Sequence, residues 1–226
     1  MIYYTRQLCE KFYEIQKWIL QGCDIVLAII DYGAGNLRSV AKACEKTGAK
    51  VTVTNDKSVI LSADHVILPG VGAFGDCMNN INKYNLSDCI KEVIERKTPF
   101  LGICLGLHLL FDESEETPNI KGLGIFKGRN VKIPEKAGLK IPHMGWNSLR
   151  FTKSSPLFDG LSENPFVYFV HSYYMNPDDK SIISAVCDYS AELPVALSVG
   201  NVHAVQFHPE KSSDTGLLIL KNFVNL

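Results

Sequence analysis

The chain has 226 residues, 46% of them hydrophobic and 21% charged, which is enough apolar sequence to bury a core and excludes a disordered chain. Its 23 Lys and Arg residues against 24 Asp and Glu residues give a net charge of −1, without the basic block typical of nucleic-acid-binding proteins. No apolar run approaches the roughly 20 residues of a membrane span, so we expect neither nucleic acid nor a membrane as a partner.

An amphipathic helix is predicted over the first 23 residues. Apolar side chains recur there at helical spacing, at Leu8, Phe12, Ile15 and Ile19. Charged residues interrupt the segment every few positions, which excludes a secretory signal, and their mixed signs argue against a membrane-surface helix. A helix packed on the domain, an extension from an upstream start codon and a partner-binding helix remain open. We assign residues 1–23 to an N-terminal extension and residues 24–226 to a single domain.

Strands and helices alternate between residues 25 and 111. Short apolar runs predict strands at residues 25–30, 51–54, 65–68 and 100–103. Helical spacing predicts a helix from residue 37 toward a cap at Gly48, and further helices over residues 74–84, 86–97 and 105–111. This strand–helix repeat is typical of a parallel α/β sheet with right-handed crossovers.

The second half of the chain has a different pattern. Residues 121–150 are rich in Gly and Pro, and strands joined by short turns are predicted at residues 166–170, 182–186, 195–199 and 203–207. A last helix is predicted over residues 214–224. We therefore expect an α/β fold with a mostly parallel central sheet flanked by helices and an additional mixed or antiparallel sheet region.

Seven cysteines occur at irregular spacing, at positions 9, 23, 44, 77, 89, 104 and 187. No two are separated by only two residues, so a zinc ribbon or a thioredoxin-type site is not expected. The odd count and the length of the chain argue against a disulfide framework. We expect a reducing, cytoplasmic location and no metal site, with most cysteines acting as small buried hydrophobic residues.

One cysteine has the sequence context of a nucleophile. Gly102-Ile103-Cys104-Leu105-Gly106 lies between a predicted strand and a predicted helix and has the form Gly-x-nucleophile-x-Gly. The two glycines permit the tight turn that presents the thiol, and the start of the helix stabilises a thiolate. The N–H of Leu105 can serve a developing oxyanion. The alternative is a buried cysteine in an ordinary strand–helix turn.

A base for this thiol is predicted near the C-terminus. Pro209 favours an extended conformation at His208, and residues two apart in an extended chain point the same way, so His208 and Glu210 are expected side by side. The carboxylate then accepts from one imidazole nitrogen and leaves the other for Cys104. A strand-end histidine beside a solvated glutamate is the alternative.

A glycine loop is expected next to the nucleophile. Pro69-Gly70-Val71-Gly72 follows a predicted strand, and parallel sheets place their sites beyond the carboxyl ends of their strands. The loop lacks the Lys-Ser/Thr that would follow in a phosphate-binding loop. We therefore predict that its backbone N–H groups serve an oxyanion.

The three motifs around Gly70, Cys104 and His208 together resemble those of the class I, or triad, glutamine amidotransferases. Further motifs are similar to those of the glutaminase subunits of imidazole glycerol phosphate synthases, enzymes of histidine biosynthesis: Asp31 to Asn36, Pro142 to Asn147, His171 to Tyr174 and Phe207 to Ser212. The resemblance runs from about residue 25 to the C-terminus, and residues 1–23 have no counterpart in it.

The resemblance implies a reaction and its residues. Cys104 attacks the side-chain amide of glutamine, His208 shuttles the proton and Glu210 orients His208. A glutamyl thioester forms, ammonia leaves and water releases glutamate, with no cofactor. The Leu105 N–H and an amide of the Gly70–Val71 loop stabilise the oxyanion, and that loop reorients to gate activity.

The resemblance also implies substrate contacts. The positions that hold the backbone atoms of glutamine match Gly72, Ser172 and Tyr173, and Glu116 matches an acidic residue near the amino group. The family usually has Gln where this chain has His108, a residue that helps to hold the substrate. The departure bears on glutamine affinity rather than on the reaction.

The implied partner is a (β/α)8-barrel cyclase that forms a heterodimer with the chain. Ammonia passes to this cyclase, which makes imidazole glycerol phosphate and an aminoimidazole carboxamide ribotide. The residues that match the family's interface are Asn36, Trp146, Tyr173 and Lys211.

Three alternatives are kept. A paralogous glutaminase that supplies ammonia to a surface-sugar synthase would have the same triad and would differ in its partner. A catalytically silent regulatory subunit is disfavoured by an intact Cys104, His208 and Glu210. A cysteine peptidase on a related fold is disfavoured by the motifs at residues 143–147 and 171–174.

Overall fold

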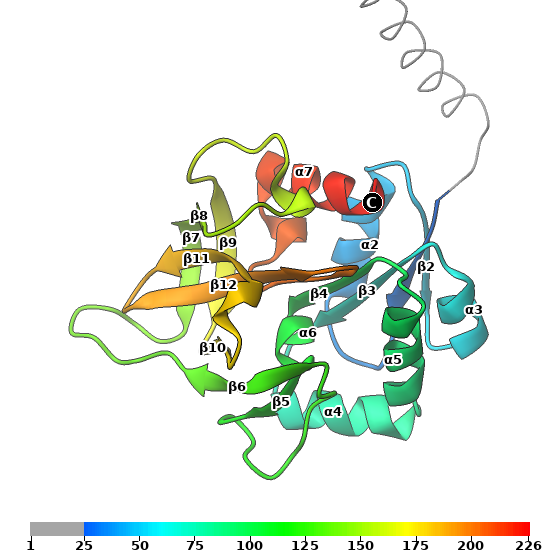
Figure 1. Cartoon of the computed structure of the whole chain (residues 1–226), viewed down its shortest axis with the longest axis horizontal. Helices are drawn as coiled ribbons and strands as arrows, with labels where there is room; N and C mark the ends of the chain where they lie inside the picture. The colour runs from blue at the N-terminus through cyan, green and yellow to red at the C-terminus, as the bar shows by residue number, and fades with distance from the viewer. Residues whose placement is uncertain (1–24) are drawn as a thin grey trace, which may run out of the picture.

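The computed structural model describes residues 25–226. An eight-stranded sheet forms its centre (Figure 1). Five neighbouring strands pair in parallel, in the order β2 (Lys50–Thr54), β1 (Val26–Ile30), β3 (His65–Gly70), β4 (Phe100–Cys104) and β13 (Val202–Val205). Three antiparallel strands complete it, in the order β12 (Glu192–Val199), β11 (Ile183–Asp188) and β8 (Arg150–Phe151). The prediction of a mostly parallel sheet with added antiparallel strands is confirmed.

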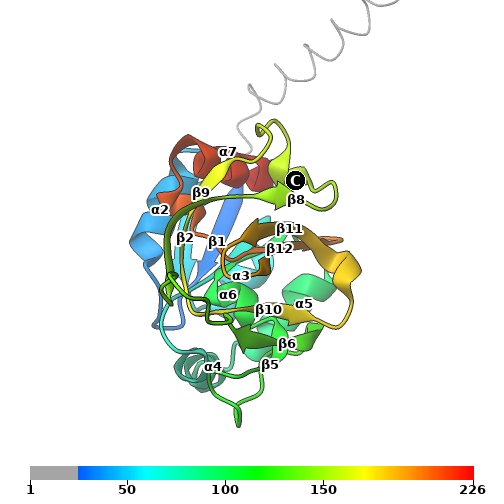
Figure 2. The ribbon, with the colours of Figure 1, turned by 90° about the vertical axis from the view of Figure 1, so that its left-hand side faces the viewer.

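Helices cover both faces of this sheet (Figure 2). One face packs on α2 (Leu37–Glu45) and α7 (Ser213–Val224), and the other packs on α3 (Lys57–Ser62), α4 (Phe74–Lys83) and α5 (Ser87–Glu95). Strand β1 illustrates the division, because Leu27 and Ile29 enter one apolar core whereas Ala28 and Ile30 enter the other. A strand buried on both faces explains why its sequence is apolar throughout.

Two small sheets flank the main one. Strands β10 (Tyr173–Pro177), β6 (Phe126–Lys132) and β5 (Phe111–Ser114) form the first, and β7 (His143–Ser148) pairs antiparallel with β9 (Phe166–His171) in the second. Short 3-10 helices lie at Pro156–Phe158, Lys180–Ile182 and Pro209–Lys211. The added sheet region is thus split into separate ladders.

The predicted helix over residues 105–111 was too long. Helix α6 spans only Leu105–His108, and Phe111 already belongs to β5. The carbonyl of Leu110 accepts from the backbone N–H groups of Ile125 and Phe126. Hydrogen bonds to a distant segment of the chain thus replace those of a further helical turn. The apolar pattern extends past residue 108 because Leu109, Leu110 and Phe111 are all buried. A run of buried apolar residues fits a helix and a strand equally well, so the pattern did not show where the helix ends.

The helix predicted over residues 1–23 lies outside the described residues. Within residues 25–226, no helix is long and apolar enough to cross a membrane. The division at residue 24 stays a prediction.

Candidate active site

The carboxyl ends of three adjacent parallel strands bring the predicted site residues together. In the register of β3 and β4, Gly70 lies opposite Cys104, and in that of β4 and β13, Ile103 lies opposite Val205. The glycine loop after β3 and the segment after β13 therefore flank the cysteine, one on each side. This is the edge at which parallel sheets carry their sites.

Cys104 stands on a strained turn between β4 and α6. Its φ of 53° and ψ of −108° lie in a region that few residues other than glycine adopt. A Cβ on Gly106 would lie 1.9 Å from the carbonyl oxygen of Leu68, and one on Gly102 would lie 2.9 Å from the carbonyl oxygen of Gly106. Both glycines are thus required by close packing, as expected of a nucleophile elbow.

His208 and Glu210 form a buried pair. His208 Nδ1 lies 2.8 Å from Glu210 Oε1, and only 3% and 2% of the two side chains are exposed. Burial alone would lower the pKa of His208, but the neighbouring Cys104 and Glu210 raise it to about 10. Among the groups that raise this pKa, Cys104 contributes most and Glu210 follows. His208 Nε2 has no hydrogen-bond partner within the described residues, which leaves this nitrogen for the sulfur. A protonated imidazole beside the sulfur is the partner that a thiolate needs.

Hydrogen bonds fix the backbone of His208 to strand β9. Its N–H donates to the carbonyl oxygen of Tyr168 at 2.9 Å. The hydroxyl of Ser212 bridges the same two residues, because it donates to the His208 carbonyl at 2.6 Å and accepts from the Tyr168 N–H at 3.0 Å. The position of the imidazole therefore follows the position of β9.

Gln206 is a site residue that sequence reasoning missed. It is completely buried, its Nε2 lies 3.8 Å from Cys104 Sγ and its Oε1 lies 2.6 Å from His108 Nε2. A signal was present, since a residue two positions before His208 on an extended segment points the same way as His208. The buried His108 thus has its Nε2 bound to Gln206, and its Nδ1 has no partner among the described residues.

Side chains hold the glycine loop on both sides of Gly70. The hydroxyl of Tyr32 donates to the carbonyl of Pro69 at 2.8 Å, and the thiol of Cys77 lies 3.6 Å from the carbonyl of Val71. The loop's exit is fixed by Glu116, whose Oε2 accepts from the N–H of Phe74 at 2.9 Å.

Within that loop, Val71 is exposed and Gly72 has a φ of 103°, a left-handed conformation that favours glycine. The N–H of Val71 has no hydrogen-bond partner within residues 25–226. An unpartnered amide here is available to a ligand or to a rotated loop.

The remaining predicted substrate residues lie on or beside β10. Tyr173 begins this strand, Ser172 directly precedes it, and β10 packs against α6, the helix that carries His108. The carbonyl of Tyr173 accepts from His171 Nδ1 at 2.9 Å, and His171 Nε2 lies 3.0 Å from His143 Nδ1. This buried histidine pair was not predicted. No hydrogen bond links Ser172 or Tyr173 directly to Cys104 in the described part of the chain.

The predicted interface residues are only partly together. Trp146 meets the ring of Tyr168 at 6.2 Å between centroids, and Lys211 Nζ lies 5.8 Å from the centroid of the same ring. Asn36 caps α2, which packs against the short 3-10 helix that contains Lys211. Tyr173, on β10 of another sheet, makes no hydrogen bond to any of these residues.

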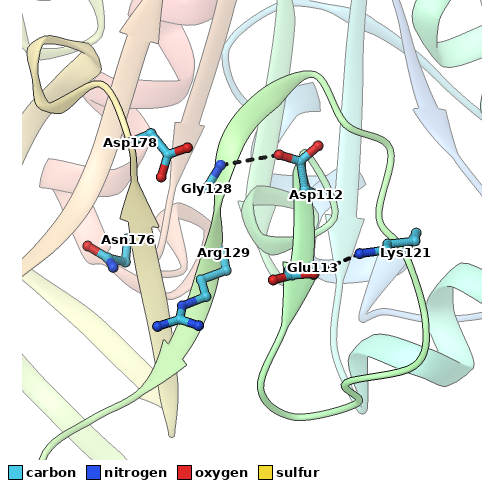
Figure 3. A pocket seen from close by; sticks show the side chains of 7 residues that line it. All are labelled: Asp112, Glu113, Lys121, Gly128, Arg129, Asn176 and Asp178. Atoms are coloured by element: carbon cyan, nitrogen blue, oxygen red, sulfur yellow. Dashed lines mark hydrogen bonds and ion pairs between the residues drawn. The ribbon is translucent and has the colours of Figure 1, made fainter.

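A solvent-open pocket of about 570 Å³ lies over strands β5, β6 and β10, and neither Cys104, His208 nor Glu210 lines it (Figure 3). Two of its three carboxylates are paired, since Glu113 binds Lys121 at 2.8 Å, and Asp112 binds Lys127 at 3.1 Å and the N–H of Gly128. Neither histidine nor cysteine lines it. The pocket therefore contains neither a thiol nor an imidazole, in contrast to the site around Cys104. Among residues 25–226, no group of three His, Cys, Asp or Glu side chains is placed to hold a metal ion.

Comparisons with known proteins define the class. Residues 28–226 match the family model described as glutamine amidotransferase class-I. A solved glutamine amidotransferase superposes with a TM-score of 0.69 at 19% identity, covering 89% of this chain and all of that one. PurLQS from Thermotoga maritima superposes with a TM-score of 0.71, also at 19% identity, over 89% of this chain and 98% of that one. The chain belongs to the class I glutamine amidotransferase family.

Several relatives that are about half identical to this chain are named imidazole glycerol phosphate synthase subunit HisH. The protein from Aquifex aeolicus is 52% identical over 196 residues, covering 86% of this chain and 94% of that protein. HisH 1 from Methanococcus maripaludis is 50% identical over 205 residues, and HisH from Methanocaldococcus jannaschii is 49% identical over 201. Each of these two comparisons covers 89% of this chain and the whole relative.

Proposed function

We propose that this chain is the glutaminase subunit of an imidazole glycerol phosphate synthase and supplies ammonia for histidine biosynthesis. The observation that carries the proposal is the convergence of Cys104, His208 and Glu210 at one sheet edge, in a chain 49 to 52% identical to HisH subunits. Residues 24–226 are proposed as the amidotransferase domain and residues 1–23 as an extension, in a cytoplasmic enzyme.

The reaction is proposed to begin with attack of the Cys104 thiolate on the side-chain amide carbon of glutamine. The tetrahedral intermediate collapses as the His208 imidazolium gives its proton to the leaving nitrogen, which departs as ammonia. Neutral His208 then takes a proton from water, and the resulting attack on the thioester releases glutamate and regenerates the thiolate. Glu210 holds the imidazole by its Nδ1–H throughout, as the 2.8 Å contact allows. This chemistry requires no cofactor.

The oxyanion of the intermediate is proposed to lie between the Leu105 N–H and an amide of the Gly70–Val71 loop. The position of Gly70 opposite Cys104 and the unpartnered N–H of Val71 support this assignment. Rotation of one peptide at Gly70 would present or withdraw the second donor. Loss of one oxyanion donor costs about 10²–10³ in kcat, so such a rotation suffices to gate the enzyme.

The substrate is proposed to be held through its backbone atoms by Gly72, Ser172 and Tyr173, with Glu116 near its amino group. One oxygen of Glu116 is engaged by the Phe74 N–H, which leaves the other for the substrate ammonium. His108 would contact glutamine only through Nδ1, because its Nε2 is bound to Gln206.

The partner is proposed to be a (β/α)8-barrel cyclase that forms a heterodimer with the chain. The outward face of β7 and β9 supports a docking site, because it exposes 62% of Met144, 52% of Trp146 and 58% of Phe166. Adjacent exposed apolar side chains of this size mark a protein interface. Lys211 borders this face over the ring of Tyr168, and Asn36 and Tyr173 are proposed to lie at its edge.

Purification together with a cyclase from the same organism tests the proposal. We expect glutamine-dependent formation of imidazole glycerol phosphate, with one glutamate released for each product. Glutamate release without any effect on cyclase turnover would instead favour an ammonia acceptor of another kind.

A further inference from the structure

Gln206 lies between the nucleophile and a buried histidine. Its Nε2 approaches Cys104 Sγ at 3.8 Å and its Oε1 approaches His108 Nε2 at 2.6 Å. Both neighbours come from the elbow, at the end of β4 and in α6, whereas Gln206 directly follows β13. The amide therefore spans the space between the two elements that build the site.

The polarity of this contact follows from the atoms involved. A carbonyl oxygen only accepts, so the short contact requires that His108 Nε2 carries the proton and donates it to Gln206 Oε1. Burial lowers the pKa of His108 to about 4, so the ring is neutral near neutral pH. His108 thus has its proton on Nε2 and a lone pair on Nδ1, where no hydrogen-bond partner lies within the described residues.

The opposite orientation of the Gln206 amide is disfavoured. Turned over, the amide would present its NH2 group to His108 Nε2, so the proton of His108 would have to move to Nδ1, where no acceptor lies within the described residues. The carbonyl oxygen of Gln206 would then face the sulfur, so a lone pair would oppose a thiolate. In the observed orientation, an N–H of Gln206 points to Cys104 Sγ.

We propose that His108 is a positioning residue that locks the Gln206 amide so that Gln206 donates an N–H to the Cys104 thiolate. The inference rests on the proposed function, in which this thiolate attacks glutamine. It adds Gln206 to the groups that stabilise the nucleophile, and it gives His108 a role separate from substrate contact. Hydrogen bonds to a charged group are stronger than bonds between neutral groups. The N–H of Gln206 therefore stabilises the thiolate although sulfur is a weak acceptor.

The test compares substitutions at both residues with a matched control. His108→Leu removes the donor that holds Gln206, Gln206→Met removes the N–H at similar volume, and His108→Gln restores a donor. His203→Leu is the control, because His203 is equally buried on β13, bonds Ser198 Oγ at 3.0 Å and lies on the opposite side of that strand from Gln206.

Two readouts separate positioning from general damage. The first is the rate at which iodoacetamide alkylates Cys104 in the full-length chain near neutral pH, quantified on the Cys104 peptide by mass spectrometry. The second is kcat and KM for glutamine in the complex with the cyclase. Circular dichroism confirms that each variant is folded.

We expect His108→Leu and Gln206→Met to slow alkylation and to lower kcat by about five- to tenfold, with KM within about threefold. His108→Gln should recover both rates relative to His108→Leu, because it restores a donor to Gln206. His203→Leu should keep both rates within about twofold of the wild type.

A folded His108→Leu or Gln206→Met variant that alkylates at the wild-type rate would overturn the inference. If His108→Leu does not fold, Gln206→Met decides by the same criterion. Alkylation needs no glutamine, so a wild-type chain that releases no glutamate would refute the proposed function and leave this comparison intact.

Discussion

Tyr168 and His208 are joined twice through their backbones, by the direct bond from the His208 N–H and by the bridging hydroxyl of Ser212. The ring of Tyr168 lies on the exposed face of β9, against Trp146 and under Lys211. One residue thus belongs both to the proposed docking face and to the support of the proposed base. A partner that shifts β9 would move His208 with it.

Lys211→Ala tests this connection. We expect the substitution to reduce partner-stimulated glutaminase activity several-fold while it changes the free energy of unfolding by less than about 1 kcal/mol, because an exposed cation–π contact contributes little to stability. Lys83→Ala is the matched control, since Lys83, the last residue of α4, also has its Nζ 5.8 Å from the centroid of a tyrosine ring, that of Tyr84. Equal stimulation in both variants would remove Lys211 from the connection.

Cys104→Ala tests the nucleophile. The variant complex should lose glutamine-dependent synthesis and keep synthesis driven by added ammonium, because free ammonia bypasses the thioester. Cys187→Ala, at a buried cysteine on β11, should keep both activities. Loss of the ammonium-driven reaction in a correctly assembled Cys104→Ala complex would contradict the role given to Cys104.

Gly106→Ala tests whether the elbow is set by packing. Its new methyl group would lie 1.9 Å from the Leu68 carbonyl oxygen, so backbone must move, and we expect a loss of about 3 kcal/mol or more. In Gly48→Ala the new methyl group has no neighbour within 4 Å, and only the left-handed φ of 96° is unfavourable for alanine. This substitution should lower the free energy of unfolding by about 1 kcal/mol. Urea denaturation of the two variants gives the comparison, and equal losses would show that the close contact is not what requires Gly106.

Much of this arrangement could be predicted, because its signals are local. The strand before Cys104, the glycines around it and the His208–Glu210 pair each depend on residues within five positions of one another. Short strands such as β5 and β10 could not be predicted, because they are defined by their pairing with β6, a distant segment of the chain. The His108–Gln206 contact joins residues 98 positions apart, and nothing near His108 in the sequence indicates it.

Buried histidines predict the acid sensitivity of the fold. Burial lowers the pKa of His203 to about 4, whereas an imidazole in the unfolded chain titrates near about 6.5. Between these values the unfolded chain binds more protons, so stability falls as the pH falls through this window.

From about pH 7.5 to about pH 5, His203 alone should account for a loss of about 2 kcal/mol. His203→Leu should therefore lose about 2 kcal/mol less than the wild type over the same range, as measured by urea denaturation at both pH values. If His203→Leu has the same pH dependence as the wild type, the pKa of His203 is not lowered in the folded chain.

The central claim is that this chain is a glutaminase whose activity depends on its cyclase partner. The direct measurement is the rate of glutamate release by the chain alone, by its complex with the cyclase, and by the complex with the ribonucleotide ligand of the cyclase bound. We predict a slow rate in the free chain and a rise of about 10²–10³-fold in the liganded complex, the effect of completing one oxyanion donor at the Gly70–Val71 loop. Full activity in the free chain would contradict the gating, and the absence of glutamate release in all three samples would contradict the function itself.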